Sequence, residues 1–139
     1  MSAEFHAEGL QYLLEVALTE EQSAPANFYI GLATDASLDE DATLATLTEV
    51  SGTGYARQTV ASNDTDLTSA STGTNDRKVT TKTVTFTAGG VWTGANTVFL
   101  ATTIDGTGKL LASAPLSTTR TLAVSGDTLT IAMELNLVG

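Results

Sequence analysis

Apolar and polar residues alternate almost without interruption towards the C-terminal end of the sequence. Leu129, Ile131, Met133, Leu135 and Leu137 are each separated by one residue, and most of the residues between them are polar. Successive side chains of a β-strand point to opposite faces, whereas a helix would scatter these five residues around its circumference. The pattern predicts one strand over 129–137 in an antiparallel sheet that is buried on one face and solvated on the other.

A different spacing near the N-terminal end predicts a helix. Leucine and alanine side chains recur three and four residues apart between Leu10 and Leu18, as on one face of an amphipathic helix. We expect the helix to span residues 3–20, with Ser2 as its N-cap and Pro25 beyond its end. Its apolar face either covers part of the sheet or docks on a neighbouring subunit.

Short strand-like segments separated by turn residues fill most of the remaining sequence. The other expected strands are 27–33, 50–61, 79–87, 97–104, 109–115 and 121–124. Asp105-Gly106 is typical of a hairpin turn, and Trp92 is expected to pack into the core. Strands at this spacing indicate a sandwich or a barrel rather than a parallel α/β sheet. Between these, we expect a single domain, 1–139, that is mainly β: an antiparallel, jelly-roll-like β-sandwich with one N-terminal α-helix.

Two polar segments are compatible with more than one structure. Ser37 and Glu40 have capping-box spacing, so 34–49 fits either a short helix or an acidic surface loop. The segment 62–77 contains Leu67 as its one large apolar residue. It predicts a long loop or a short edge excursion that is mobile unless a partner orders it.

The composition narrows the classes of function. The 139 residues include 26 threonines, which favour strands, and no cysteine, so disulfides and thiolate metal sites are not expected. The formal net charge is −10 with 6 lysines and arginines, whereas nucleic-acid binding requires a basic surface. The longest apolar stretch, 10–18, is too short to cross a bilayer, and we expect neither a membrane partner nor an export signal.

No residue pattern indicates catalysis or a bound cofactor. His6 is the one histidine and is expected to face solvent or a subunit rather than to bind zinc. The acidic groups at 35–41 and 63–66 do not have the spacing of an EF-hand loop. Gly52-Thr53-Gly54 is a fragment of a dinucleotide-binding motif and is better explained as a backbone bend. We therefore expect no enzyme, no metal and no cofactor.

The segment 49–58, E-V-S-G-T-G-Y-A-R-Q, resembles a landmark of small virion proteins of tailed bacteriophages, which are labelled tail-fibre-like or structural. Other landmarks of that family are the aromatic-led strand at 28–32, the tryptophan turn at 90–94 and the strand–G-D-T–strand ending at 124–129. The chain departs from the family in its acidic insertion (35–48), its polar loop (64–76) and the end of strand 98–104. The resemblance implies a structural component of a virion, on the head or on the tail.

A small β protein with a docking helix is also similar to capsid decoration (cement) proteins. This similarity implies a homo-oligomer, dimer or trimer, that binds the phage major capsid protein on the outer surface of the virion and is assembled in the host bacterial cytoplasm. A tail or tail-fibre-associated protein, bound to a tail protein, is the alternative. A third interpretation is a carbohydrate-binding module whose candidate aromatic residues are Tyr12, Tyr29, Tyr55 and Trp92.

The residues expected to contact a partner lie on the predicted helix, the glycine bend and the polar loop. They are Leu10, Leu14, Tyr55, Arg57, Asp64, Asp66 and Asp76. Arg57 fits either a local surface salt bridge or a cation that binds a carboxylate across a subunit contact. From the second alternative, Arg57→Ala is expected to weaken particle association more than folding.

Overall fold

The computed structural model describes residues 2–71, 73–74 and 76–138. Its strands are β1 (Ser2–Phe5), β2 (Asn27–Ala33), β3 (Gln58–Ala61), β4 (Leu67–Ser71), β5 (Asp76–Thr81), β6 (Val84–Thr87), β7 (Ala95–Ala101), β8 (Leu110–Arg120), β9 (Thr128–Ile131) and β10 (Glu134–Val138). One helix, α1 (Ala7–Leu14), continues into a short π-helical segment, η1 (Glu15–Thr19). The prediction of a mainly β chain with one helix near its N-terminus is confirmed.

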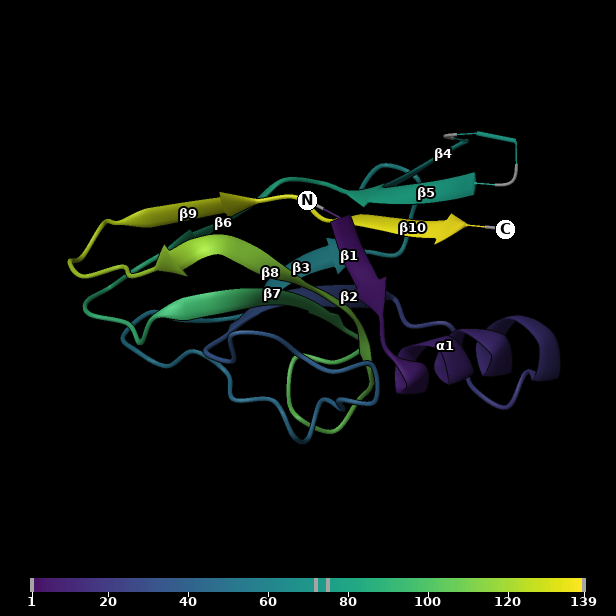
Figure 1. The fold of residues 1–139 in the computed structure, drawn as a ribbon, viewed down its shortest axis with the longest axis horizontal. Coiled ribbons are helices and arrows are strands. Elements are labelled where there is room, and N and C mark those ends of the chain that lie inside the picture. Colours follow the sequence, from purple (N-terminus) through teal and green to yellow (C-terminus); the bar gives the residue numbers. More distant parts are fainter. Residues whose placement is uncertain (1, 72, 75, 139) are drawn as a thin grey trace.

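Eight strands form one continuous sheet in the order β3-β2-β7-β8-β1-β10-β5-β4, and β6 and β9 form a separate two-stranded sheet. The large sheet curves until it is nearly closed into a barrel, with α1 and the tips of β5 and β10 at one end and β9 at the other (Figure 1). The hydrogen bonds therefore describe one curved sheet and a small one, rather than the two packed sheets of the expected jelly-roll-like β-sandwich.

The strand β1 joins the two parts of the large sheet. It pairs in parallel with β10, where Ser2 lies opposite Glu134, and antiparallel with β8, where Phe5 lies opposite Ala112. The expected helix over 3–20 with Ser2 as its cap is therefore wrong at its start. Residues 2–5 alternate between exposed and more buried positions as a strand does, and α1 begins only after them.

The helix packs on the sheet through a face that is rotated from the predicted one. Gly9 and Tyr12 are buried, and Gly9 lies against the backbone of β8 so closely that an added Cβ would come within 2.5 Å of Leu111 Cα. In contrast, Leu14 and Leu18 remain 56% and 75% exposed. The expected stripe from Leu10 to Leu18 is thus largely turned towards solvent.

The predicted terminal strand is divided between the two sheets. Leu129 belongs to β9 and pairs opposite Phe86, whereas Leu135 belongs to β10 and pairs opposite Val79. The partner strands β5 and β6 separate at the same level. There the Thr81 N–H donates to the Met133 carbonyl oxygen over 2.9 Å, and the Met133 N–H donates to the Thr81 hydroxyl over 3.0 Å. The expected single strand over 129–137 is wrong because regular strand pairing is interrupted at this link in both segments, between β9 and β10 and between β5 and β6.

Other boundaries differ from the predicted ones. The strand expected over 50–61 begins only at Gln58, and the one expected over 79–87 is divided into the last residues of β5 and all of β6. The strand expected over 121–124 is wrong, since these residues are not in a strand; β8 instead continues beyond its expected end at 115, to Arg120. The Asp105-Gly106 turn does lie between the antiparallel strands β7 and β8, which confirms the predicted hairpin.

The two ambiguous segments are both ordered by the sheet. The described part of 62–77 includes β4 and the first residues of β5, which form an antiparallel hairpin rather than a long loop. The segment 34–49 has turns but no helix. Its Leu44 is buried and packs in a small cluster with Phe99 and Leu110. It therefore covers one face of the sheet.

The main core lies inside the curve of the large sheet, and β6 and β9 close it on one side. Ile30, Phe86, Val98 and Met133 are completely buried there. Trp92 is 3% exposed, so the prediction that it packs into the core is confirmed.

Candidate functional site

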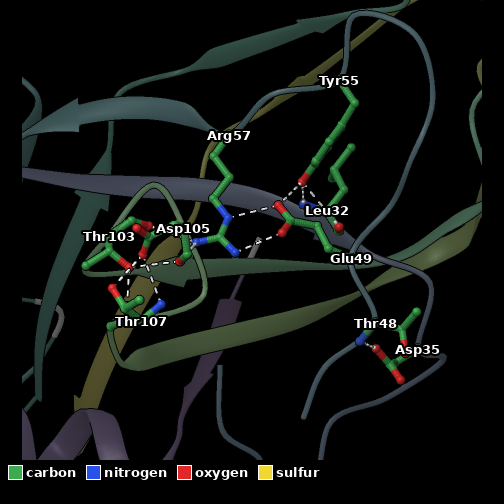
Figure 2. Close-up of polar contacts among 10 residues, drawn as sticks. Leu32, Asp35, Thr48, Glu49, Tyr55, Arg57, Thr103, Asp105 and Thr107 are labelled. Atoms are coloured by element: carbon green, nitrogen blue, oxygen red, sulfur yellow. Dashed lines mark hydrogen bonds and ion pairs between the residues drawn. The ribbon is translucent and has the colours of Figure 1, made fainter. Parts of the chain in front are cut away.

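Arg57 forms the centre of a polar cluster inside the protein. Its Nε and Nη2 donate hydrogen bonds of 2.9 and 2.8 Å to the two carboxylate oxygens of Glu49, and its Nη1 donates to the carbonyl oxygens of Thr103 and Asp105 (Figure 2). The guanidinium also lies 5.1 Å from the ring centre of Phe99. The Arg57 side chain is 5% exposed and that of Glu49 29%, so the carboxylate that pairs with Arg57 belongs to its own chain and the ion pair is largely buried.

Tyr55 extends the same cluster into the core. Its hydroxyl donates to Glu49 over 2.7 Å and accepts the Leu32 N–H over 2.9 Å (Figure 2). The ring stacks on Phe86 and meets Trp92 edge-on at 5.3 Å. Burial raises the pKa of Tyr55 far above its ordinary value, and the nearby Glu49 carboxylate raises it further, against an opposing effect of the Leu32 hydrogen bond. The hydroxyl therefore stays protonated and acts as a structural donor.

The glycines between Glu49 and Tyr55 allow the chain to turn back. Gly52 and Gly54 have φ values of +151° and +83°, a region that glycine adopts easily and other residues rarely. An added Cβ on Gly52 would overlap the Trp92 ring. The Trp92 indole N–H donates to the Thr53 carbonyl oxygen over 2.7 Å. The segment 49–58 is thus a compact folding unit whose side chains bind each other and the tryptophan turn.

The turn 103–107, whose carbonyl oxygens bind Arg57, is stabilised by hydrogen bonds within the turn. The Thr107 hydroxyl and backbone N–H donate to the Asp105 carboxylate over 2.6 and 2.9 Å. The Thr107 hydroxyl lowers the pKa of Asp105 most, so this carboxylate is ionised at neutral pH. Its ionised form stabilises a turn that presents two carbonyl oxygens to Arg57.

His6 lies inside the protein, so the expectation that it faces solvent or a subunit is wrong. It is 1% exposed, with Nδ1 2.9 Å from the Asp39 carbonyl oxygen and Nε2 2.7 Å from the Ser113 hydroxyl. Because a carbonyl oxygen only accepts, Nδ1 carries a proton. The side chain binds the start of α1 to β8 and to the 34–49 segment.

The three aspartates among the expected contact residues occupy different positions. Asp64 is exposed in the turn before β4, and Asp76 begins β5. Asp66 forms an ion pair with Lys82 at 2.7 Å and accepts the Ala61 N–H at 2.8 Å. The bond to Lys82 is the main reason that the pKa of Asp66 is lowered. These residues do not form one acidic site. Within the described ranges, no three histidine or acidic side chains are grouped as metal ligands.

An apolar cavity of about 630 Å³ lies at the end of the sheet nearest α1. Leu13 of α1 lines it opposite the β4–β5 hairpin and the end of β10, and Arg77 and Lys78 lie beside it. Its other apolar lining residues include Phe5, Phe28, Leu67, Val79, Leu135 and Leu137. Leu10 and Leu14, the two expected contact residues on the helix, are exposed on the neighbouring surface of α1. This cavity and the exposed helix surface together form the apolar end.

The cavity was not predicted from the sequence, although two signals pointed towards it. Leu67 was an isolated apolar residue in a polar segment, which is typical of a strand with one buried face. Leu135 and Leu137 belonged to the terminal stripe. Their meeting with Phe5 depends on the pairing of β1 with β10, which brings together residues more than 130 positions apart.

The aromatic residues proposed for a carbohydrate site come from different parts of the fold, and Tyr29 is half-buried in β2. Tyr12 and Trp92 are buried, and Tyr55 packs against Phe86. Among the described helices, none has the length and apolar character that a membrane crossing requires.

Residues 9–136 match the family model described as Podophage GP4 fiber I protein gp80, and the chain belongs to this family of tailed-phage virion structural proteins. The resemblance stated from the sequence is thereby confirmed, and the chain is a phage virion structural protein. A comparison with curated proteins gives no match.

Proposed function

We propose that the protein is a non-catalytic subunit of a fibre on the surface of the phage particle. The observation that carries this proposal is the match of nearly the whole chain to a family described as a fibre protein. The sequence-based preference for a capsid decoration protein relied on size, β content and a docking helix, which a fibre subunit shares. The family description favours the tail or fibre alternative.

The geometry supports a structural role. Arg57, Glu49 and Tyr55 are bound to one another and to backbone groups, and within the described ranges every buried side-chain nitrogen and oxygen has a hydrogen-bond partner. Such groups stabilise the fold and are not free to bind a substrate. The outward-facing feature that remains is apolar, which suits contact with protein surfaces.

Electron cryomicroscopy of intact particles tests the location. Particles that carry the protein are compared with particles from a phage that lacks its gene. The difference density is expected in fibres attached to the tail, in contact with a tail protein. Density spread over the outer face of the head would replace the fibre proposal with capsid decoration and the major capsid protein as partner. Absence of any difference in the particle would overturn both.

A further inference from the structure

We propose that the apolar end is a self-association surface, in which the exposed leucines of α1 and η1 of one copy occupy the apolar cavity of a second copy. The inference rests on the proposed structural function, but it is tested on the purified protein. Its failure is therefore distinguishable from failure of the proposed location on the particle.

The apolar surface is continuous from the inside of the cavity to the outside of the helix. Leu13 lines the cavity. At 100° per residue, Leu10 and Leu14 lie about 60° and about 100° further around α1 in the same direction. They are 37% and 56% exposed, and Leu18, one turn further, is 75% exposed. A small apolar ligand could fill the cavity but would leave these leucines in water, whereas a protein surface covers both.

The cavity and the leucines lie at the same end of the molecule, where α1 faces the tips of β5 and β10 (Figure 1). A surface that has a projecting apolar row beside an apolar cavity is complementary to its own copy about a two-fold axis. Each copy then supplies one helix and one cavity, and every contact occurs twice. A second copy therefore covers both the cavity and the exposed leucines, and no different apolar protein is needed.

The charges at this end are also complementary. The helix side carries Glu15 and the exposed Glu20 and Glu21, whereas the hairpin side carries Arg77 and Lys78. Lys78 already pairs with Glu134 of the same chain at 3.5 Å, so the complementary charge on the hairpin side is mainly that of Arg77. Arg77 is exposed and, among the described contacts, bonds to the Ser71 hydroxyl and to backbone carbonyl oxygens but to no carboxylate. A second copy turned about a two-fold axis places an acidic helix side against a basic hairpin side, which favours this orientation.

The test measures the mass of the purified protein by light scattering and sedimentation over a range of concentrations. The wild-type chain is expected to form dimers. Leu14→Glu is expected to weaken dimerisation by about tenfold or more, because it places a charge on the helix row at the centre of the interface. Leu137→Glu, at the mouth of the cavity, is expected to do the same. Val124→Glu is the matched control, because Val124 is 60% exposed in the loop between β8 and β9 and should leave the dimer unchanged.

A mixture of the Leu14→Glu and Leu137→Glu chains separates helix-in-cavity packing from other contacts. In a mixed pair one helix–cavity contact is free of both substitutions, whereas each variant alone carries a substitution in both contacts. The mixture is therefore expected to associate more tightly than either variant alone. Thermal melts with wild-type transitions show that the variants fold. The proposal would be overturned if the wild-type chain were a monomer, or if Val124→Glu lost the dimer while the two leucine variants kept it. It would also be overturned if native mass spectrometry showed a monomer with a bound acyl chain.

Discussion

The guanidinium of Arg57 and the carboxylate of Glu49 form a bidentate ion pair within the chain, with hydrogen bonds of 2.9 and 2.8 Å. Both residues belong to the segment that carries the strongest resemblance to phage virion proteins. Their pairing gives this segment a physical role, because it fixes the turn between β2 and β3 and connects it to the turn between β7 and β8 through the Thr103 and Asp105 carbonyl oxygens.

Replacing Arg57 with alanine is expected to destabilise the free protein. The change leaves the partly buried Glu49 carboxylate without its cation and two carbonyl oxygens without a donor, at a cost of about 2–4 kcal/mol. Chemical denaturation followed by circular dichroism measures this loss. Arg120→Ala is the control, since Arg120 is exposed and forms no side-chain bond among the described contacts. The structure thus predicts a clear loss of folding stability, whereas the sequence-based expectation placed the main effect of Arg57→Ala on particle association. An unchanged unfolding midpoint would favour the partner-contact interpretation.

Tyr55→Phe isolates the hydroxyl from the ring. The ring contacts with Phe86 and Trp92 remain, but the Leu32 N–H loses its acceptor and Glu49 loses a donor. We expect a loss of about 1–2 kcal/mol in the free energy of unfolding. Tyr29→Phe serves as the comparison, because the Tyr29 hydroxyl has no hydrogen bond among those described. Equal effects of the two substitutions would show that the cluster does not stabilise the fold.

Gly9→Ala is expected to destabilise the protein, although alanine is normally better than glycine in a helix by about 1 kcal/mol. An alanine Cβ would lie 2.5 Å from Leu111 Cα and 2.6 Å from the Leu110 carbonyl oxygen, so α1 would have to move away from β8. We expect a net loss of about 1–3 kcal/mol in a denaturant titration. At Gly106, where an added Cβ meets nothing within 4 Å, alanine is expected to be nearly neutral. A stabilised Gly9→Ala protein would contradict the close packing of the helix.

Acid should weaken the link between Asp66 and Lys82. The pKa of Asp66 is lower in the folded protein than its ordinary value of 3.8, chiefly because of the bond from Lys82. The contribution of this carboxylate to stability is therefore complete well above pH 3.8 and is lost as the pH falls through the lower, folded-state pKa. Unfolding midpoints measured between neutral pH and about pH 3 should fall less for Asp66→Asn than for the wild-type chain. Asp64→Asn, at an exposed carboxylate without an ion pair among the described contacts, should follow the wild-type curve.

The sequence allowed the orientation of side chains to be predicted better than the connections between strands. Alternation correctly placed Ile131 and Met133 towards the core, because local backbone geometry alone determines which face a side chain occupies. It did not predict that the strands are interrupted at Thr81 and Met133, because the hydrogen bond between these residues joins segments about 50 residues apart. The residues of β1 were assigned to the helix for a different reason: four residues are too few to show the alternation that identifies a strand.

The candidate site was predictable only in part. Leu10 and Leu14 were singled out on the helix and are exposed, whereas Tyr55 and Arg57 were singled out with them and lie inside. An arginine has the same sequence signature whether it binds a partner or its own chain. Only the fold shows that Glu49 is close enough to pair with it.

The position of β1 has a consequence for the order in which the protein matures during translation. The parallel partner of β1, strand β10, is synthesised more than 130 residues after it, since Ser2 pairs with Glu134. The two parts of the large sheet therefore cannot join through β1 until β10 has been synthesised. The apolar cavity, which needs Phe5 and Leu137 together, is formed only at that moment. A growing chain that lacks β10 therefore does not yet present the surface through which we propose that two copies associate.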